Sequence, residues 1–259
     1  MVQRDTPWEP GTPCWTDLMT TDAAAARDFY SALFGWHIEV GGPETGNYGM
    51  CTVNGREVAG IGGMQGEETH PPVWSTYLAT DDAQVTLDAA EKLGANILVP
   101  VMDVMEFGRM GVFQLPSGGA VGLWQSGTHN GFGIANEPGT VTWNEFLTRD
   151  YDAAKSFYAD LFGYQYQEIG DAGFKYATIS LDGQRPIGGI GELPGEVPAH
   201  IPPHWRVYFD VADADASAAK STELGGSVLQ EPHDMPYGRW ADLADPQGAP
   251  FSVVRAASA

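Results

Sequence analysis

Two stretches of the chain share one pattern of apolar and polar positions. In each, a short strand-like run leads to an Asp and then to a segment with apolar residues at i, i+3, i+4 and i+7, the spacing of an amphipathic helix. The stretches, residues 15–36 and 143–164, lie 128 residues apart, and ten of their twenty-two positions are identical. Asp22 and Asp150 stand where they would cap the helix start, and Gly35 and Gly163 where a left-handed residue ends it.

Strand-like runs follow each helix. In the first copy we expect strands at 37–40, 48–53 and 58–61, with Asn54-Gly55 as a hairpin turn between the last two. This completes a βαβββ unit. A second unit begins at Val73, and it returns more faintly in the second half, where Trp74 and Tyr77 reappear as Trp205 and Tyr208.

The repeats predict an α+β fold in which four βαβββ units form two domains. The Gly-rich segment 127–140 lacks helical or strand periodicity and is the expected linker between them. The expected boundaries are a lead-in at 1–12, a first domain at 13–126 (units 13–65 and 72–126), and a second domain at 141–255 (units 141–193 and 203–255).

Composition and charge narrow the class of partner. Thirteen Lys and Arg against thirty-four Asp and Glu give a formal net charge of −21. Such a surface repels phosphate backbones and anionic headgroups, so we expect neither nucleic acid nor a membrane as a partner. The N-terminus has no signal-peptide core and no apolar run is long enough to span a bilayer, so a cytoplasmic monomer or homodimer is expected. Two cysteines make neither a disulfide framework nor a zinc set.

The motifs FYxxLFGW and FYxxLFGY, and the turn Asp245-Pro246-Gln247-Gly248 before the last strand, resemble the vicinal oxygen chelate superfamily. That superfamily includes glyoxalase I, bleomycin-resistance proteins, fosfomycin-resistance enzymes and extradiol dioxygenases. The chain looks most like its two-domain glyoxalase-like proteins, often labelled hydroxylases. The resemblance implies open half-barrel sheets, each with a ligand cleft on its concave face.

The resemblance also implies a divalent metal, held in that cleft by His, Gln or Glu. The corresponding positions of this chain hold Trp15, Trp143, Ser75, Arg206, Gly122 and Ser252. Indole, glycine and guanidinium do not coordinate such ions, and a lone serine is a poor ligand. The six histidines show no paired spacing, and most lie in loops where a solvated side chain is expected. We therefore expect a cleft without a metal or other cofactor.

Strand alternation suggests what else faces the cleft. If Trp15 and Trp143 point inward, Asp17 and Glu145 do so too, because residues i and i+2 share a face. A carboxylate partly desolvated by indole has a raised pKa and can act as a general base. The alternative is that both carboxylates pair with nearby cations or lie at a wet strand end.

Glu145 is the stronger catalytic candidate because of its expected neighbours. Arg206, Tyr208 and Asp210 share a face of the partner strand and could stabilise an anionic oxygen. The alternative is a structural ion pair from Arg206 to Glu145 or Asp210. In the first half the equivalents are Ser75, Tyr77 and Ala79, a less polar wall suited to an aromatic ligand. Further candidates to line or gate a cleft are Trp74, Arg109, His233 and Arg239.

The sequence thus predicts a small-molecule enzyme of isomerase or lyase type, acting by acid/base chemistry on a carbonyl-containing or aromatic metabolite. The alternative is a non-catalytic protein that sequesters an antibiotic or reactive metabolite, with Trp15 and Trp143 as stacking surfaces.

Overall fold

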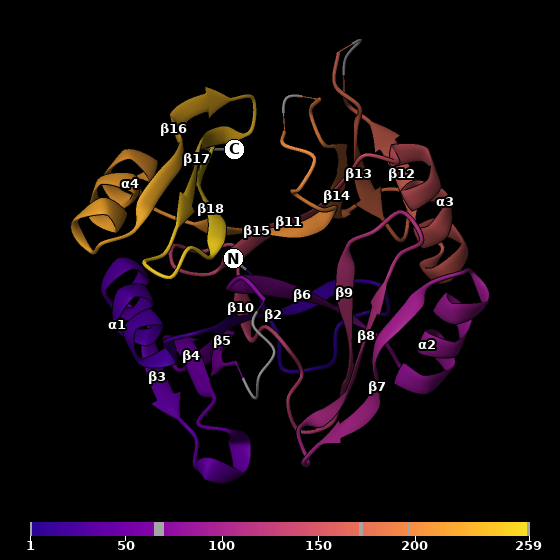
Figure 1. Cartoon of the computed structure of the whole chain (residues 1–259), viewed down its shortest axis with the longest axis horizontal. Helices are drawn as coiled ribbons and strands as arrows, with labels where there is room; N and C mark the ends of the chain where they lie inside the picture. Colours follow the sequence, from indigo (N-terminus) through magenta and orange to yellow (C-terminus); the bar gives the residue numbers. More distant parts are fainter. Residues whose placement is uncertain (1, 65–69, 171–172, 196, 258–259) are drawn as a thin grey trace.

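The computed structural model describes residues 2–64, 70–170, 173–195 and 197–257. Its main elements are two eight-stranded sheets and four helices (Figure 1). The first sheet has the order β3 (His37–Val40), β4 (Gly49–Val53), β5 (Arg56–Gly63), β2 (Pro13–Thr20), β6 (Val73–Ala79), β9 (Ala120–Ser126), β8 (Gly108–Gln114), β7 (Asn96–Val104). The second has the order β12 (Gln165–Glu168), β13 (Tyr176–Ser180), β14 (Pro186–Glu192), β11 (Val141–Thr148), β15 (His204–Asp210), β18 (Pro250–Ala256), β17 (Gly238–Ala244), β16 (Ser227–Met235).

The predicted α+β class and the four βαβββ units are confirmed. Within each half, the first strand of one unit pairs antiparallel with the first strand of the next, β2 with β6 and β11 with β15. Each half of the chain therefore forms one eight-stranded sheet of its own. The helices are α1 (Ala23–Phe34), α2 (Ala83–Lys92), α3 (Tyr151–Phe162) and α4 (Ala214–Glu223), with a short 3₁₀ turn at Pro43–Thr45.

The predicted helix caps are confirmed in both copies. Asp22 accepts a hydrogen bond from the Ala25 amide at 3.0 Å, and Asp150 caps α3 in the same way. Gly35 and Gly163 end the helices with φ of 73° and 72°. The Asn54-Gly55 turn also has two positive φ angles, as a two-residue hairpin with the twist of its strands requires.

The strand predicted at 58–61 extends beyond its bounds at both ends, to Arg56–Gly63. β7 continues to Val104 although it contains Pro100. It is the edge strand of its sheet, and the missing N–H of proline costs nothing on an edge that no strand faces.

The two sheets lie back to back, with their open sides facing away from each other (Figure 1). Aromatic side chains fill the layer between them, where the ring of Phe209 in the second domain lies 5.3 Å from Trp74 and 5.0 Å from Phe34. The Tyr30 hydroxyl donates to Asp245 at 3.3 Å across the same boundary. Helix α1 packs near α4 and α2 near α3, and the buried apolar side chains of the described residues form two clusters, each with members from both domains.

The lead-in and the linker are built into the first domain. β1 (Val2–Gln3) pairs antiparallel with β10 (Ile134–Ala135). The linker also bonds to the sheet, since the Phe132 amide donates to the Cys14 carbonyl at 2.7 Å and the Gly133 amide to the Glu57 carbonyl at 2.9 Å. Residues 127–135 therefore form an ordered strap across the strand ends, where the sequence predicted only a connection.

Position 1 of the predicted lead-in, position 65 of the first predicted unit and positions 171–172 of the third lie outside the described residues. So do positions 66–69 and 196, which fall between predicted units, and positions 258–259, which follow the second domain. Among the helices that the structure describes, none has the length and apolarity needed to cross a bilayer.

Candidate functional site

Four side chains meet on the concave face of the second sheet. Glu145 is at the middle of β11 and only 7 % exposed. Tyr208 from β15 donates to its Oε1 at 2.6 Å, and Tyr176 from β13 to its Oε2 at 2.9 Å. Trp143, two residues before Glu145, donates from Nε1 to the Tyr176 hydroxyl at 2.9 Å. Trp143 and Glu145 thus share a face, as predicted.

The first sheet carries an equivalent set. Tyr77 donates to Asp17 at 3.2 Å and Tyr48 at 3.3 Å, while Trp15 Nε1 donates to the Tyr48 hydroxyl at 3.1 Å. The two sets match by the repeat: Trp15, Asp17 and Tyr48 lie 128 positions before Trp143, Glu145 and Tyr176.

Glycines on the neighbouring strand make room for both sets. A Cβ atom at Gly60 on β5 would lie 1.6 Å from the Tyr48 hydroxyl oxygen, and one at Gly189 on β14 would lie 2.0 Å from that of Tyr176. The close approach of a tyrosine ring therefore explains Gly60 and Gly189 within the glycine runs of the two strands.

Burial decides the charge state of each set. It raises the pKa of Asp17 to about 7, although the hydrogen bonds from Tyr77 and Tyr48 oppose the shift. Burial likewise raises the pKa of Glu145, against the opposing effects of Arg206 and the two phenols. The pKa values of Tyr48, Tyr77, Tyr176 and Tyr208 are all raised, chiefly by burial, so the phenols stay protonated and donate.

Arg206 has a different partner from the two predicted ones. Its Nη1 donates to Asp242 Oδ2 at 3.1 Å, and Ser252 donates to the other oxygen of Asp242. Arg206 also lies opposite Glu145 in the register of β11 and β15. The predicted ion pairs from Arg206 to Glu145 or Asp210 are replaced by this bond to Asp242, a residue of β17 that the sequence reading did not consider.

Other predicted site residues lie elsewhere. Trp74 does not reach the cleft. It lies three positions before Tyr77 on β6, so its side chain points to the opposite face of the sheet. There it packs between the sheets and donates to the Tyr30 hydroxyl at 2.9 Å. Asp210 is at the end of β15, where its backbone bonds to Thr140 and Gly139; in the described part of the chain its carboxylate has no hydrogen bond to Glu145, Arg206 or Tyr208.

The two turn arginines brace the outer hairpins. Arg109 pairs with Asp103 at 3.1 Å, and Arg239 with Asp234 at 3.2 Å and with Asp215. His233 packs on Trp240 with ring centroids 4.5 Å apart, and Trp240 in turn lies 6.2 Å from Tyr208. Only His233 of these three is therefore near the cleft.

The strap packs on Trp15 of the first set, and Trp143 of the second set is more exposed, although Asp17 and Glu145 are equally buried at 7 % exposed. The His129 ring lies 4.4 Å from Trp15 and 5.5 Å from Trp124, and Phe132 lies 5.6 Å from Trp15. His129 is only 7 % exposed and neither ring nitrogen has a hydrogen bond, so the expectation of a solvated loop histidine is wrong here. Burial accordingly lowers its pKa to about 4. By contrast, Trp143 and Tyr208 are half-buried.

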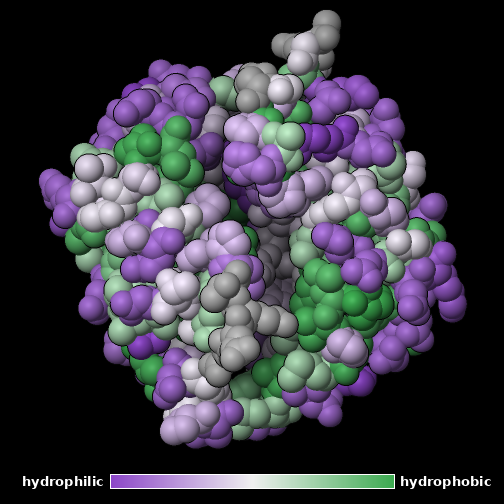
Figure 2. Space-filling model, viewed as in Figure 1, coloured by the Kyte–Doolittle hydropathy of each residue, from purple (hydrophilic) through white to green (hydrophobic). Residues whose placement is uncertain are grey.

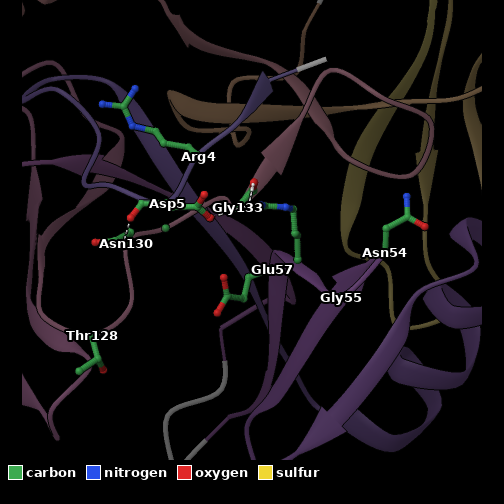
Figure 3. Close-up of a pocket in the computed structure, with 10 residues that line it drawn as sticks. Arg4, Asp5, Asn54, Gly55, Glu57, Thr128, Asn130 and Gly133 are labelled. Atoms are coloured by element: carbon green, nitrogen blue, oxygen red, sulfur yellow. Dashed lines mark hydrogen bonds and ion pairs between the residues drawn. The ribbon is translucent and has the colours of Figure 1, made fainter.

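Two pockets flank the strap. One, of about 420 Å³, is polar and lies between the lead-in, the β4–β5 turn and the strap; Arg4, Asp5, Glu57 and Asn130 line it (Figure 3). The other, of about 350 Å³, lies between the lead-in, the strap and the second domain, and it includes Trp143. Figure 2 shows the surface hollowed near the centre of the view, between the arms of the sheets.

The residues at the implied metal positions do not fit a divalent ion. The ring of Tyr77 fills the place of a side chain at Gly122, where a Cβ would lie 2.2 Å from Tyr77 Cδ1. Ser252 and Arg206 both bond to Asp242. Among the described residues, no group of three or more His, Cys, Asp or Glu side chains is placed to hold a metal.

Besides Asp242, three important residues were missed from the sequence, and two of these three had a signal. Tyr48 and Tyr176 both follow their tryptophan by 33 positions, and extending the repeat beyond residues 36 and 164 would have found them. His129 had none, because nothing in a glycine-rich segment shows that it packs on a sheet.

The paired βαβββ sheets and their matched clefts define a class of protein, and the sequence comparison agrees with it. The sequence model of the Glyoxalase/Bleomycin resistance protein/Dioxygenase superfamily matches residues 14–123 and 138–253. The chain belongs to this superfamily.

Individual relatives are similar over nearly the whole chain. CFP32 of Mycobacterium tuberculosis, whose name assigns it provisionally as a glyoxylase, is 42 % identical over 96 % of this chain and 97 % of its own length. The anthracycline biosynthesis protein DnrV of Streptomyces peucetius is 39 % identical over 96 % and 94 %.

Solved structures share the fold at low identity. The Mn(II)-bound glyoxalase from Novosphingobium aromaticivorans has a TM-score of 0.65 at 16 % identity, covering 94 % of this chain and 82 % of that one. The 2,3-dioxygenase LapB from Pseudomonas sp. KL28 has a TM-score of 0.64 at 13 % identity, covering 96 % and 94 %.

Proposed function

We propose that this chain is a small-molecule enzyme whose second-domain cleft carries out acid/base chemistry, of isomerase or lyase type, on an aromatic metabolite with a carbonyl group. The observation that carries the proposal is the buried Glu145 carboxylate, held by two phenols and flanked by the half-buried Trp143 and Tyr208. We also propose that this chemistry needs no metal, because the donor set there does not suit one.

The geometry gives each residue a role. A raised pKa makes Glu145 a stronger base, able to remove a proton from a carbon next to the substrate carbonyl. The electron pair moves to the carbonyl oxygen, and Arg206, which uses Nη1 on Asp242, has further N–H donors to stabilise that oxygen. In a substrate whose enolate is conjugated with a further carbon–carbon double bond, Glu145 then delivers the proton to the far carbon of that system. The electron pair on oxygen re-forms the carbonyl as the double bond shifts, which balances an isomerisation. Tyr176 and Tyr208 orient the carboxylate.

The name of one relative supports the substrate class. DnrV is named for anthracycline biosynthesis, and anthracyclines are polycyclic aromatic ketones. We infer that the substrate of this chain is of the same broad kind, an aromatic molecule with an enolisable carbonyl.

The test is a matched pair of variants, Glu145→Gln and Asp17→Asn. A panel of aromatic ketones is incubated with the protein, and isomerised or cleaved products are followed by mass spectrometry. With any substrate so found, Glu145→Gln is expected to lower kcat by about 10² or more, the usual contribution of a general base. Asp17→Asn should change kcat less than about threefold, because in the first cleft the strap rings occupy the face of Trp15 that a substrate ring would need. Full activity in Glu145→Gln would refute the assignment.

The alternative is a protein that binds and sequesters its ligand. Each Glu145 oxygen already accepts a hydrogen bond from a phenol, an arrangement that also suits a carboxyl group with a purely structural role. In that case the panel would yield a tightly bound ligand that is recovered chemically unchanged from wild type and from Glu145→Gln alike.

A further inference from the structure

The two cleft tryptophans differ in what covers them. Trp15 is only 4 % exposed because the rings of His129 and Phe132 pack against it. Trp143 is its equivalent in the repeat, and it is half-buried. In the described segments no aromatic ring packs on Trp143. The first tryptophan thus has an internal aromatic partner, and the second has an open face.

The space next to Trp143 is the smaller of the two pockets, which we call the seam pocket. It has a volume of about 350 Å³, at the low end of the range typical of small-molecule sites. Its walls come from both halves of the chain: Trp8 from the lead-in, Phe132 from the strap, and Val141, Trp143 and Ile187 from the second domain. Phe132 therefore has Trp15 on one side and the seam pocket on the other.

The lining indicates the chemistry of a ligand. Trp143 offers the most open aromatic surface, because the Arg4 guanidinium lies over the Trp8 ring and Phe132 is only 2 % exposed. An indole favours a flat ring in edge-to-face or offset contact. The charged residues in the wall are two arginines and two carboxylates, Arg4, Arg185, Glu9 and Asp182, so neither sign predominates. A ligand of either charge would meet as much repulsion as attraction, and an uncharged ring would meet neither.

We propose that the seam pocket binds one planar, uncharged aromatic ring, which packs against Trp143 as His129 and Phe132 pack against Trp15. The inference rests on the proposed function in one respect. Trp143 donates to Tyr176, and Tyr176 donates to Glu145, each at 2.9 Å. Among the described residues, Glu145, Tyr176 and Tyr208 do not line the seam pocket, so a ring held on Trp143 is linked to the proposed base only through these two hydrogen bonds.

The test uses 2-naphthol, a flat uncharged bicyclic probe, titrated into the full-length protein by isothermal calorimetry. Two threonines give a matched pair of variants. Thr142 lines the seam pocket and donates to Asn136 at 3.0 Å, while Thr128 lines the polar pocket and donates to the Glu106 carbonyl at 3.1 Å. Each replacement by Trp loses one surface hydrogen bond and fills one pocket.

Wild type is expected to bind one equivalent of 2-naphthol. Thr142→Trp should weaken binding at least tenfold, and Thr128→Trp less than twofold. A second variant, Trp143→Leu, should also weaken binding at least tenfold, and it serves if Thr142→Trp does not fold. No saturable binding, or equal losses in the two threonine variants, would overturn the proposal.

Glu145→Gln separates this inference from the proposed function. The variant should bind 2-naphthol as wild type does, because the probe lies on Trp143. Normal probe binding together with unchanged turnover would refute the chemistry and leave the pocket standing. Lost turnover in Glu145→Gln without probe binding to wild type would refute the pocket and leave the chemistry standing.

Discussion

At the scale of single residues, the central feature is a carboxyl group that accepts hydrogen bonds from two tyrosines. The pair of phenols was not predicted from the sequence, although Trp15, Asp17, Trp143 and Glu145 were placed on their correct faces by strand alternation. Alternation relates residues on one strand, whereas Tyr48 and Tyr176 come from a strand two positions away in the sheet. Only the length of the repeat linked them to the site.

The carboxyl of the first set, Asp17, makes a prediction about pH. Its pKa is about 7 in the folded protein against 3.8 for an exposed group, so folding takes up a proton between these values. Stability contributed by the protonated form is therefore lost as the pH rises from about 4 to about 7, by at most about 4 kcal/mol. Asp17→Asn removes this loss.

Urea unfolding of wild type and Asp17→Asn at pH 5 and pH 8 measures the effect. The free energy of unfolding of the variant, minus that of wild type, should increase as the pH rises, because only wild type ionises a buried carboxyl. Equal pH dependence in the two proteins would show that Asp17 titrates normally.

At the scale of elements, the helices were predictable to the residue because their signals are local. Asp22 and Gly35 mark the two ends of α1 in the sequence, and the equivalent residues of the repeat mark the ends of α3. Strand ends were less predictable, since a strand extends as far as its neighbour pairs with it. The strap was not predictable as ordered structure, because its hydrogen bonds go to distant strands and not to its own residues.

The glycines of β5 provide a test at this scale. Gly60→Ala would place a Cβ 1.6 Å from the Tyr48 hydroxyl oxygen, so the ring must move and its bonds to Asp17 and Trp15 are lost. We expect a loss of about 1–3 kcal/mol in the free energy of unfolding, the range for overpacking.

The control is Gly63→Ala on the same strand. Its nearest neighbour would be Ala23 Cβ at 3.9 Å, which is ordinary contact, so its stability should change by less than about 1 kcal/mol. Chemical denaturation measures both. If the two variants are equally stable, the close approach of the Tyr48 ring does not require glycine at position 60.

At the scale of the whole molecule, the two domains share both of their buried apolar clusters. Trp36 donates from Nε1 to the Gly139 carbonyl at 2.6 Å, and Tyr30 to Asp245, so the boundary is hydrogen-bonded as well as apolar. The sequence predicted two domains but not this contact, because an inward-facing aromatic residue does not reveal whether its partners belong to the same half.

Unfolding should therefore occur in one cooperative step. Trp36 and Trp74 at the boundary report by fluorescence, and far-ultraviolet circular dichroism reports the sheets; the two curves are expected to coincide in urea. Two separated transitions would mean that each half is stable without the other.

The strap also has a consequence for the order in which the halves are joined. It is the continuation of β9, and it turns back over the sheet it has just left, so that only the domain preceding it is covered. A rearranged gene encoding the halves in reverse order would place a connecting peptide after β18 instead, and the first half would no longer lead into the strap that packs on Trp15. The difference between the two matched clefts thus depends on the order in which the domains are joined along the chain as much as on the side chains within the clefts.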